Sequence, residues 1–112
     1  MSRLVTNELD LARELGSDQG MFVLFYSSWC FFSAMFLPVF ESYAERSPGN
    51  FCRVDLEYMP GAAEEYAIEV TPTIIFFKNG KTERRLDGEP EIGLDENKLV
   101  KFIHSVSVPV KT

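Results

Sequence analysis

Between residues 21 and 33 the sequence reads Met21-Phe-Val-Leu-Phe-Tyr-Ser-Ser-Trp-Cys-Phe-Phe-Ser33. The six residues 21–26 form an unbroken apolar run rich in β-formers, which predicts a strand buried on both faces. Residues 27–30 predict a junction from that strand to a long helix, which runs to about Arg46 and contains Pro38. Cys30 is therefore expected in the first turn of a helix, directly after a buried strand.

The patterns on either side of this junction predict strands that alternate with helices. We expect a short strand at 4–6, a helix closed by Gly16 with its apolar stripe at Leu9, Leu11, Ala12 and Leu15, a strand at 51–56 and a short helix at 61–67. A hairpin at 73–86 turns on Asn79-Gly80, and Asp95 caps a closing helix. This order calls for an α/β fold of three layers, with helices on both sides of a central mixed sheet. One domain is expected over residues 1–112.

Composition and charge restrict the classes of partner. The chain has 112 residues, of which 46% are hydrophobic, so a compact core is feasible. Its net charge of -6 argues against nucleic acids and anionic membranes as partners. The first fifteen residues lack the long apolar run of a signal peptide, and the run at 21–26 is too short to cross a bilayer. We therefore expect a cytoplasmic protein. A monomer is the expected state, with self-association through an exposed aromatic lip as the alternative.

The position of Cys30 favours a reactive thiol. Backbone N–H groups at a helix N-terminus lack partners, and together with the helix dipole they stabilise a thiolate. A free cysteine, with a pKa of about 8.5, is only slightly ionised at neutral pH, so a lowered pKa yields a nucleophile suited to attacking a disulfide. Ser33 lies on the same helical face and can hydrogen-bond that thiolate. Phe31 and Phe32 cannot both be buried behind the helix, so at least one should form an apolar lip.

Other interpretations of the cysteines and the histidine are simpler. Cys30 could be an inert core residue, although its place before a helix argues against this. Cys52 lies in a strand away from any helix terminus and is best explained as core, and a disulfide with Cys30 is geometrically disfavoured. His104, the only histidine, is expected at the surface of the closing helix. No second ligand accompanies it at a recognisable spacing, so neither a metal nor another cofactor is expected.

Several motifs resemble those of one family. Residues 25–33 resemble the thioredoxin active-site segment, in which a strand leads into Trp-Cys-x-x-Cys, and Pro38 matches the proline of the family's active-site helix. Val70-Thr-Pro-Thr-Ile-Ile-Phe-Phe-Lys-Asn-Gly80 matches the cis-proline strand and hairpin, and Gly88 matches the glycine that closes the last strand. The resemblance implies a thioredoxin fold in which Pro72 is cis and lies beside Cys30. It also implies a peptide-docking surface, made by Trp29, Phe31, Phe32, Thr71 and Pro72.

Three departures from the family pattern bear on mechanism. Ser33 replaces the resolving cysteine, so an adduct on Cys30 must wait for glutathione or another external thiol. Leu24 falls where thioredoxins carry a buried aspartate that assists proton transfer for the second cysteine, and Arg53 occupies the position of a nearby lysine. Phe31-Phe32 replaces Gly-Pro and Ala34 replaces the usual lysine, which makes the site more apolar.

The leading hypothesis is a monothiol thiol–disulfide oxidoreductase. Cys30 would form mixed disulfides with protein thiols, protein disulfides or glutathione, and Ser33 would support its thiolate. One alternative is a redox-linked binding module that retains clients, and another is a non-redox scaffold in which Cys30 is incidental. A fourth possibility is an engineered form of a dithiol thioredoxin, with serine in place of the resolving cysteine.

Overall fold

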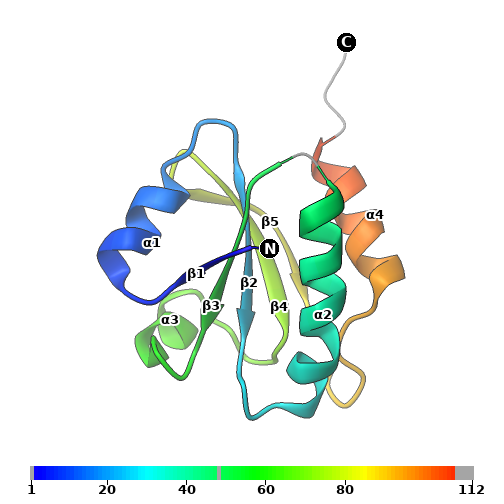
Figure 1. Ribbon diagram of the computed structural model, residues 1–112. Helices are drawn as coiled ribbons and strands as arrows, with labels where there is room; N and C mark the ends of the chain where they lie inside the picture. Colours follow the sequence, from blue (N-terminus) through cyan, green and yellow to red (C-terminus); the bar gives the residue numbers. More distant parts are fainter. Residues whose placement is uncertain (1, 48, 108–112) are drawn as a thin grey trace.

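The computed structural model describes residues 2–47 and 49–107, which form a five-stranded sheet with helices on both faces (Figure 1). The strands are β1 (Arg3–Val5), β2 (Met21–Tyr26), β3 (Phe51–Asp55), β4 (Thr73–Lys78) and β5 (Lys81–Asp87). The helices are α1 (Glu8–Leu15), α2 (Phe31–Arg46), α3 (Pro60–Glu65) and α4 (Glu96–Ser107). The strand order is β1-β3-β2-β4-β5, with β1, β3 and β2 parallel and β4 and β5 antiparallel to their neighbours. This is the thioredoxin fold, and the predicted mixed α/β sheet is confirmed.

Alternation along β2 divides the core into two halves. Val23 and Phe25 pack in one buried cluster with residues of α1 and α3, while Phe22 and Leu24 pack in a second with residues of α2 and α4. Figure 1 shows these helix pairs on opposite sides of the sheet. All six residues of β2 are buried, as a strand covered on both faces requires.

The topology brings four separate segments to one edge of the sheet, the lower edge in Figure 1. The parallel strands β2 and β3 end side by side, at Tyr26 and Asp55. Because β4 is antiparallel to β2, the residues before Thr73 lie at this same edge. The residues after Asp87 join them, because β5 is antiparallel to β4. Segments 27–30, 56–59, 66–72 and 88–93 therefore surround the start of α2.

Local signals placed most elements correctly. Asn79 and Gly80 both have positive φ (55° and 80°), which the tight turn of the β4–β5 hairpin requires. Asn7 caps α1 by accepting from the Asp10 N–H, and Asp95 caps α4 by accepting from the Lys98 N–H.

The predicted apolar stripe of α1 is wrong in part. Leu11 and Leu15, one helical turn apart, are buried, whereas Leu9 is 70% exposed and Ala12 is also exposed. Leu9 lies two residues from Leu11 and so points away from the face that contacts the sheet. Apolar residue type alone did not identify the buried face of this short helix.

Candidate functional site

Cys30 is the N-cap residue of α2 and is partly exposed. Its backbone is extended (φ −93°, ψ 124°), its N–H donates to the Ser27 carbonyl (3.1 Å), and its own carbonyl accepts from Ala34 N (2.9 Å). The chain thus turns from β2 into α2 at this residue. Because no side chain caps the helix here, the free N–H groups of the first turn face the thiol.

Opposing effects act on the ionisation of Cys30. Burial raises the pKa of the thiol, but hydrogen bonds with the side chain of Thr71, with Ser33 and with the Phe32 backbone outweigh burial and lower the pKa below its ordinary value. In its protonated form the thiol donates to the Thr71 carbonyl (3.5 Å). The net result is a larger thiolate fraction at neutral pH than a free cysteine has.

Ser33 is almost completely buried, with 1% of its surface exposed. Its Oγ accepts a hydrogen bond from the backbone N–H of Ser27 (3.2 Å), which ties the helix to the loop before Cys30. A hydroxyl that accepts in this way still has its own hydrogen to donate. Ser33 also contributes to the lowered pKa of Cys30 through that side chain. The serine is therefore a constituent of the junction and lies against the thiol.

The peptide bond between Thr71 and Pro72 is cis, as the resemblance implies, and Pro72 is buried. Thr73 Oγ1 donates to the Val70 carbonyl (2.6 Å), which closes the loop behind the proline. On the other side, a Cβ added to Gly88 would lie 2.5 Å from the Pro72 carbonyl oxygen, so only glycine permits this approach. These contacts hold the Thr71 carbonyl within reach of Cys30.

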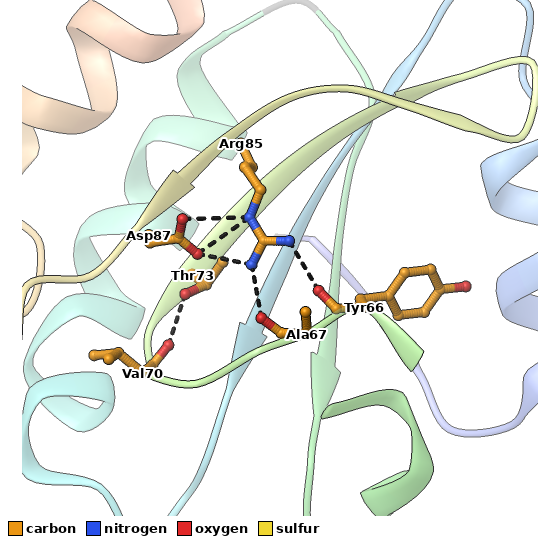
Figure 2. Close-up of polar contacts among 6 residues, drawn as sticks. All are labelled: Tyr66, Ala67, Val70, Thr73, Arg85 and Asp87. Carbon is orange, nitrogen blue, oxygen red and sulfur yellow. Dashed lines mark hydrogen bonds and ion pairs between the residues drawn. The ribbon is translucent and has the colours of Figure 1, made fainter. Parts of the chain in front are cut away.

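Arg85 of β5 fixes the start of the same loop (Figure 2). Its guanidinium donates to the carbonyls of Tyr66 (2.8 Å) and Ala67 (3.0 Å) and pairs with Asp87 (2.8 Å). Ala67 has a positive φ of 54°, so the chain leaves α3 through a left-handed residue at this point. Sequence reasoning missed this role of Arg85, because the partners are backbone atoms 18 and 19 residues away.

Apolar side chains lie exposed around Cys30. Trp29 is 83% exposed and Phe31 is 66% exposed, while Phe32 is partly buried. A Cβ at Gly93 would approach Phe32 Cβ to 2.8 Å, so the 88–93 loop packs closely on that phenylalanine. Phe31 is thus exposed, as the expected apolar lip requires, and its part in docking stays a prediction. A separate hollow of about 550 Å³, lined by Phe22, Phe76 and His104 among others, lies at the opposite edge of the sheet.

The end of β3 holds the loop before Cys30, a link that the sequence did not reveal. Ser28 Oγ donates to the buried carboxylate of Asp55, and Ser27 Oγ donates to Glu57 (3.2 Å). Asp55 also accepts from the Glu57 N–H (2.9 Å). Two parallel strands that end together bring these polar groups into contact, so topology could have indicated them where residue spacing could not.

Leu24 and Arg53, at the positions of the family's buried aspartate and nearby lysine, do not form a charged pair with each other. Leu24 is fully buried beside α2, and Arg53 forms an ion pair with Glu41 (2.8 Å) and also donates to Ser2. Tyr26 contacts the same arginine, and burial raises the pKa of its hydroxyl. Arg53, whose role the sequence left open, thus joins the N-terminus of the described chain to α2.

Cys52 and His104 have no part in this site. Cys52 is fully buried in β3, and burial raises the pKa of its thiol to about 12, so it is a core residue as expected. His104 is exposed on α4. Within residues 2–47 and 49–107, no three His, Cys, Asp or Glu side chains are grouped as a metal site requires.

Comparison with known proteins agrees with this geometry. The family model described as Thioredoxin matches residues 3–105. The chain belongs to the thioredoxin family. Members of this family are thiol–disulfide oxidoreductases that act on protein disulfides.

Individual relatives extend over most of the chain. A thioredoxin of Mycoplasmoides gallisepticum is 32% identical over 94 residues, covering 82% of this chain and 94% of its own length. A rice H-type thioredoxin is 32% identical over 100 residues, covering 87% of this chain and 81% of its own. Thioredoxin from Malassezia sympodialis superposes with a TM-score of 0.82 at 26% identity, covering 96% of this chain and 92% of that one. None of the helices that the structure describes is both long enough and apolar enough to cross a lipid bilayer.

Proposed function

We propose that this thioredoxin-family protein performs thiol–disulfide exchange through the single cysteine Cys30. The Cys30 thiolate attacks one sulfur of a disulfide, forming a mixed disulfide and expelling the other sulfur as a thiolate. An external thiolate then attacks the client sulfur of the adduct and releases Cys30 as a thiolate. The observation that carries the proposal is a partly exposed thiol of lowered pKa with Ser33, rather than a second sulfur, against it.

The other site residues receive roles from their positions. Ser33 supports the thiolate, and its hydroxyl cannot attack a disulfide sulfur as a resolving cysteine does. The exposed rings of Trp29 and Phe31, with the inner Phe32, would contact apolar side chains of a client protein. Thr71, next to the cis Pro72, would pair with the client backbone. In a reducing cytoplasm, glutathione would be one of the external thiols that release Cys30 from its mixed disulfide.

One relative's name is relevant to the single thiol. Monothiol glutaredoxin-S17 of Arabidopsis thaliana is 37% identical over 99 residues, which are 88% of this chain but only 20% of that protein. The match therefore concerns one part of a much longer chain. Because the name describes the whole protein, the match does not assign its monothiol chemistry to the part that resembles this chain.

The decisive experiment compares wild-type protein with Cys30→Ser, Cys52→Ala and Ser33→Cys. Intact-mass analysis should show that a model disulfide forms one adduct on the wild-type protein and on Cys52→Ala, and none on Cys30→Ser. Insulin reduction should be poor in the wild type and should increase in Ser33→Cys, which gains a resolving sulfur. No gain in Ser33→Cys, or no adduct on Cys30, would contradict the proposal.

Client retention is a second candidate, favoured by the exposure of Trp29 and Phe31 beside the thiol. A retention factor keeps its mixed disulfide, whereas an oxidoreductase returns to the free thiol when glutathione is added. The rate at which glutathione releases a preformed peptide adduct from Cys30 separates the two functions. An adduct that glutathione does not turn over would favour retention.

A further inference from the structure

Charge is distributed unevenly around Cys30. The four segments that meet at its edge of the sheet, together with the first two turns of α2, contain four glutamates and no lysine or arginine. The glutamates are Glu57, Glu69, Glu89 and Glu91. The hairpin residues Lys78 and Lys81 lie at the opposite edge. A client that docks on Cys30 therefore meets carboxylates but no cation in these segments.

Three of the four glutamates lie close to named parts of the site. Glu57 accepts from Ser27 Oγ, three residues before Cys30. Glu69 is exposed two residues before Thr71, whose carbonyl contacts the Cys30 thiol. Glu91 is exposed in the loop that packs on Phe32, and its φ of 64° is unusual for a residue with a side chain. Glu57 is therefore in contact with the loop before Cys30, and Glu69 and Glu91 are exposed on the two loops that border the docking surface.

Two cations close in the chain to these segments, Lys98 and Arg85, are paired with other groups. Lys98 forms an ion pair with Glu89 (2.6 Å), which neutralises the fourth glutamate. Arg85, which donates to the carbonyls of Tyr66 and Ala67 ahead of the cis-proline, is paired with Asp87. Within the described part of the chain, Glu57, Glu69 and Glu91 form no ion pair with a lysine or an arginine. We call these three residues the acidic rim.

We propose that the acidic rim selects disulfides flanked by positively charged groups and disfavours anionic ones such as glutathione disulfide. The exposed rings of Trp29 and Phe31 add a preference for apolar side chains, so the fitting client is a basic, apolar protein segment that carries a disulfide or mixed disulfide. This inference rests on the proposed function, because it assigns a substrate class to exchange at Cys30.

The physical basis is the field of fixed charges at a reacting centre. Fixed charges of one sign raise the local concentration of an oppositely charged reactant and steer its approach, while they repel a reactant of their own sign. The attacking Cys30 thiolate adds one more negative charge. Its reaction with a cationic disulfide is therefore favoured at both the encounter and the transition state. Because these carboxylates are exposed, salt should screen the effect.

The experiment uses three symmetrical disulfides of different charge: cystamine (cationic), bis(2-hydroxyethyl) disulfide (neutral) and glutathione disulfide (anionic). Each reacts in the same balanced step, in which Cys30 gains one half of the disulfide and the other half leaves as a thiolate. Rate constants are read from the intact mass of the adduct. Proteins compared are the wild type, a rim variant (Glu57→Gln, Glu69→Gln, Glu91→Gln) and a remote control (Asp18→Asn, Glu45→Gln, Glu83→Gln) with the same change in net charge.

We expect the ratio of the cystamine rate to the glutathione disulfide rate to fall by about threefold or more in the rim variant at low ionic strength. The ratio in the remote control should stay close to that of the wild type. In about 1 M salt, where the Debye length is roughly 3 Å, wild type and rim variant should converge. Taking ratios within each protein removes any general change in thiol reactivity.

The outcomes separate this inference from the function on which it rests. Equal ratios in wild type and rim variant, or an equal fall in the remote control, would overturn the role of the acidic rim while leaving exchange at Cys30 intact. If Cys30 forms no adduct even with the neutral disulfide, the proposed function itself fails. Circular dichroism and urea unfolding of each variant would establish that the rim variant remains folded.

Discussion

Removing the Arg85 side chain should loosen the loop that carries Thr71 and so weaken the activation of Cys30. In Arg85→Ala the carbonyls of Tyr66 and Ala67 lose their guanidinium partner, and Asp87 loses its ion pair (Figure 2). A hydrogen bond from a charged donor contributes about 1.5–3 kcal/mol. Because the Arg85 side chain is 31% exposed, water in the variant replaces part of the lost hydrogen bonding. Counting about 1 kcal/mol for each carbonyl, and little for the exposed ion pair, the variant should lose roughly 2 kcal/mol of unfolding free energy.

Two measurements test this reasoning. Urea unfolding gives the stability, and the pH dependence of Cys30 alkylation gives the pKa, which should rise because Thr71 helps to lower it. Arg84→Ala is the matched control, since Arg84 is an exposed neighbour on β5 whose side chain forms no hydrogen bond or ion pair within the described chain. Arg85→Lys, which cannot span both carbonyls and Asp87, should be intermediate. The reasoning is refuted if Arg85→Ala matches Arg84→Ala in both stability and thiol titration.

Three further outcomes are expected. Ser33→Ala should raise the pKa of Cys30 and slow its alkylation at pH 7. It should also lower the free energy of unfolding in urea by about 1–2 kcal/mol, because the Ser27 N–H loses its acceptor. An unchanged pKa of Cys30 would show that Ser33 does not act on the thiol. Gly88→Ala should destabilise the fold by about 1–3 kcal/mol through its clash with the Pro72 carbonyl, and a neutral effect in thermal unfolding would disprove that contact. A thiol reagent at pH 8 should modify only Cys30 in the native protein and Cys52 as well in urea, since the pKa of Cys52 is about 12 when folded; rapid native labelling of Cys52 would contradict its burial.

The local sequence predicted those elements of the fold that depend only on residues adjacent in the chain. The apolar run at 21–26 identified β2, Asn79-Gly80 identified the hairpin, and the strand–helix junction at Cys30 identified the start of α2, where Cys30 is the N-cap rather than a first-turn residue. Each of these features follows from residues adjacent in the chain. The cis form of Pro72 came instead from the family resemblance, because the residues around it do not by themselves require it.

Contacts between distant segments could not be read from spacing. Arg85 lies 19 residues from Tyr66, and Ser28 lies 27 residues from Asp55. Neither partner was predictable until the register of the strands was known, since that register decides which ends meet. Leu9 illustrates a different limit: its residue type suggested burial, but Leu11 and Leu15 already formed the face of α1 that contacts the sheet.

The residues at positions 24 and 33, Leu24 and Ser33, both suit a site in which only one thiol ionises. A buried acid beneath a thioredoxin site assists the ionisation of a second thiol, and that task is absent when the second residue is a serine. Here Leu24 is completely buried in one cluster with Phe36 and Phe40, where an unpaired carboxylate would be strongly disfavoured. The buried Ser33 Oγ accepts from the Ser27 backbone, so this hydroxyl stabilises the loop without needing to lose a proton. Two independent positions are therefore suited to a site with one ionising sulfur, which supports the monothiol mechanism over a dithiol site interrupted by a single replacement.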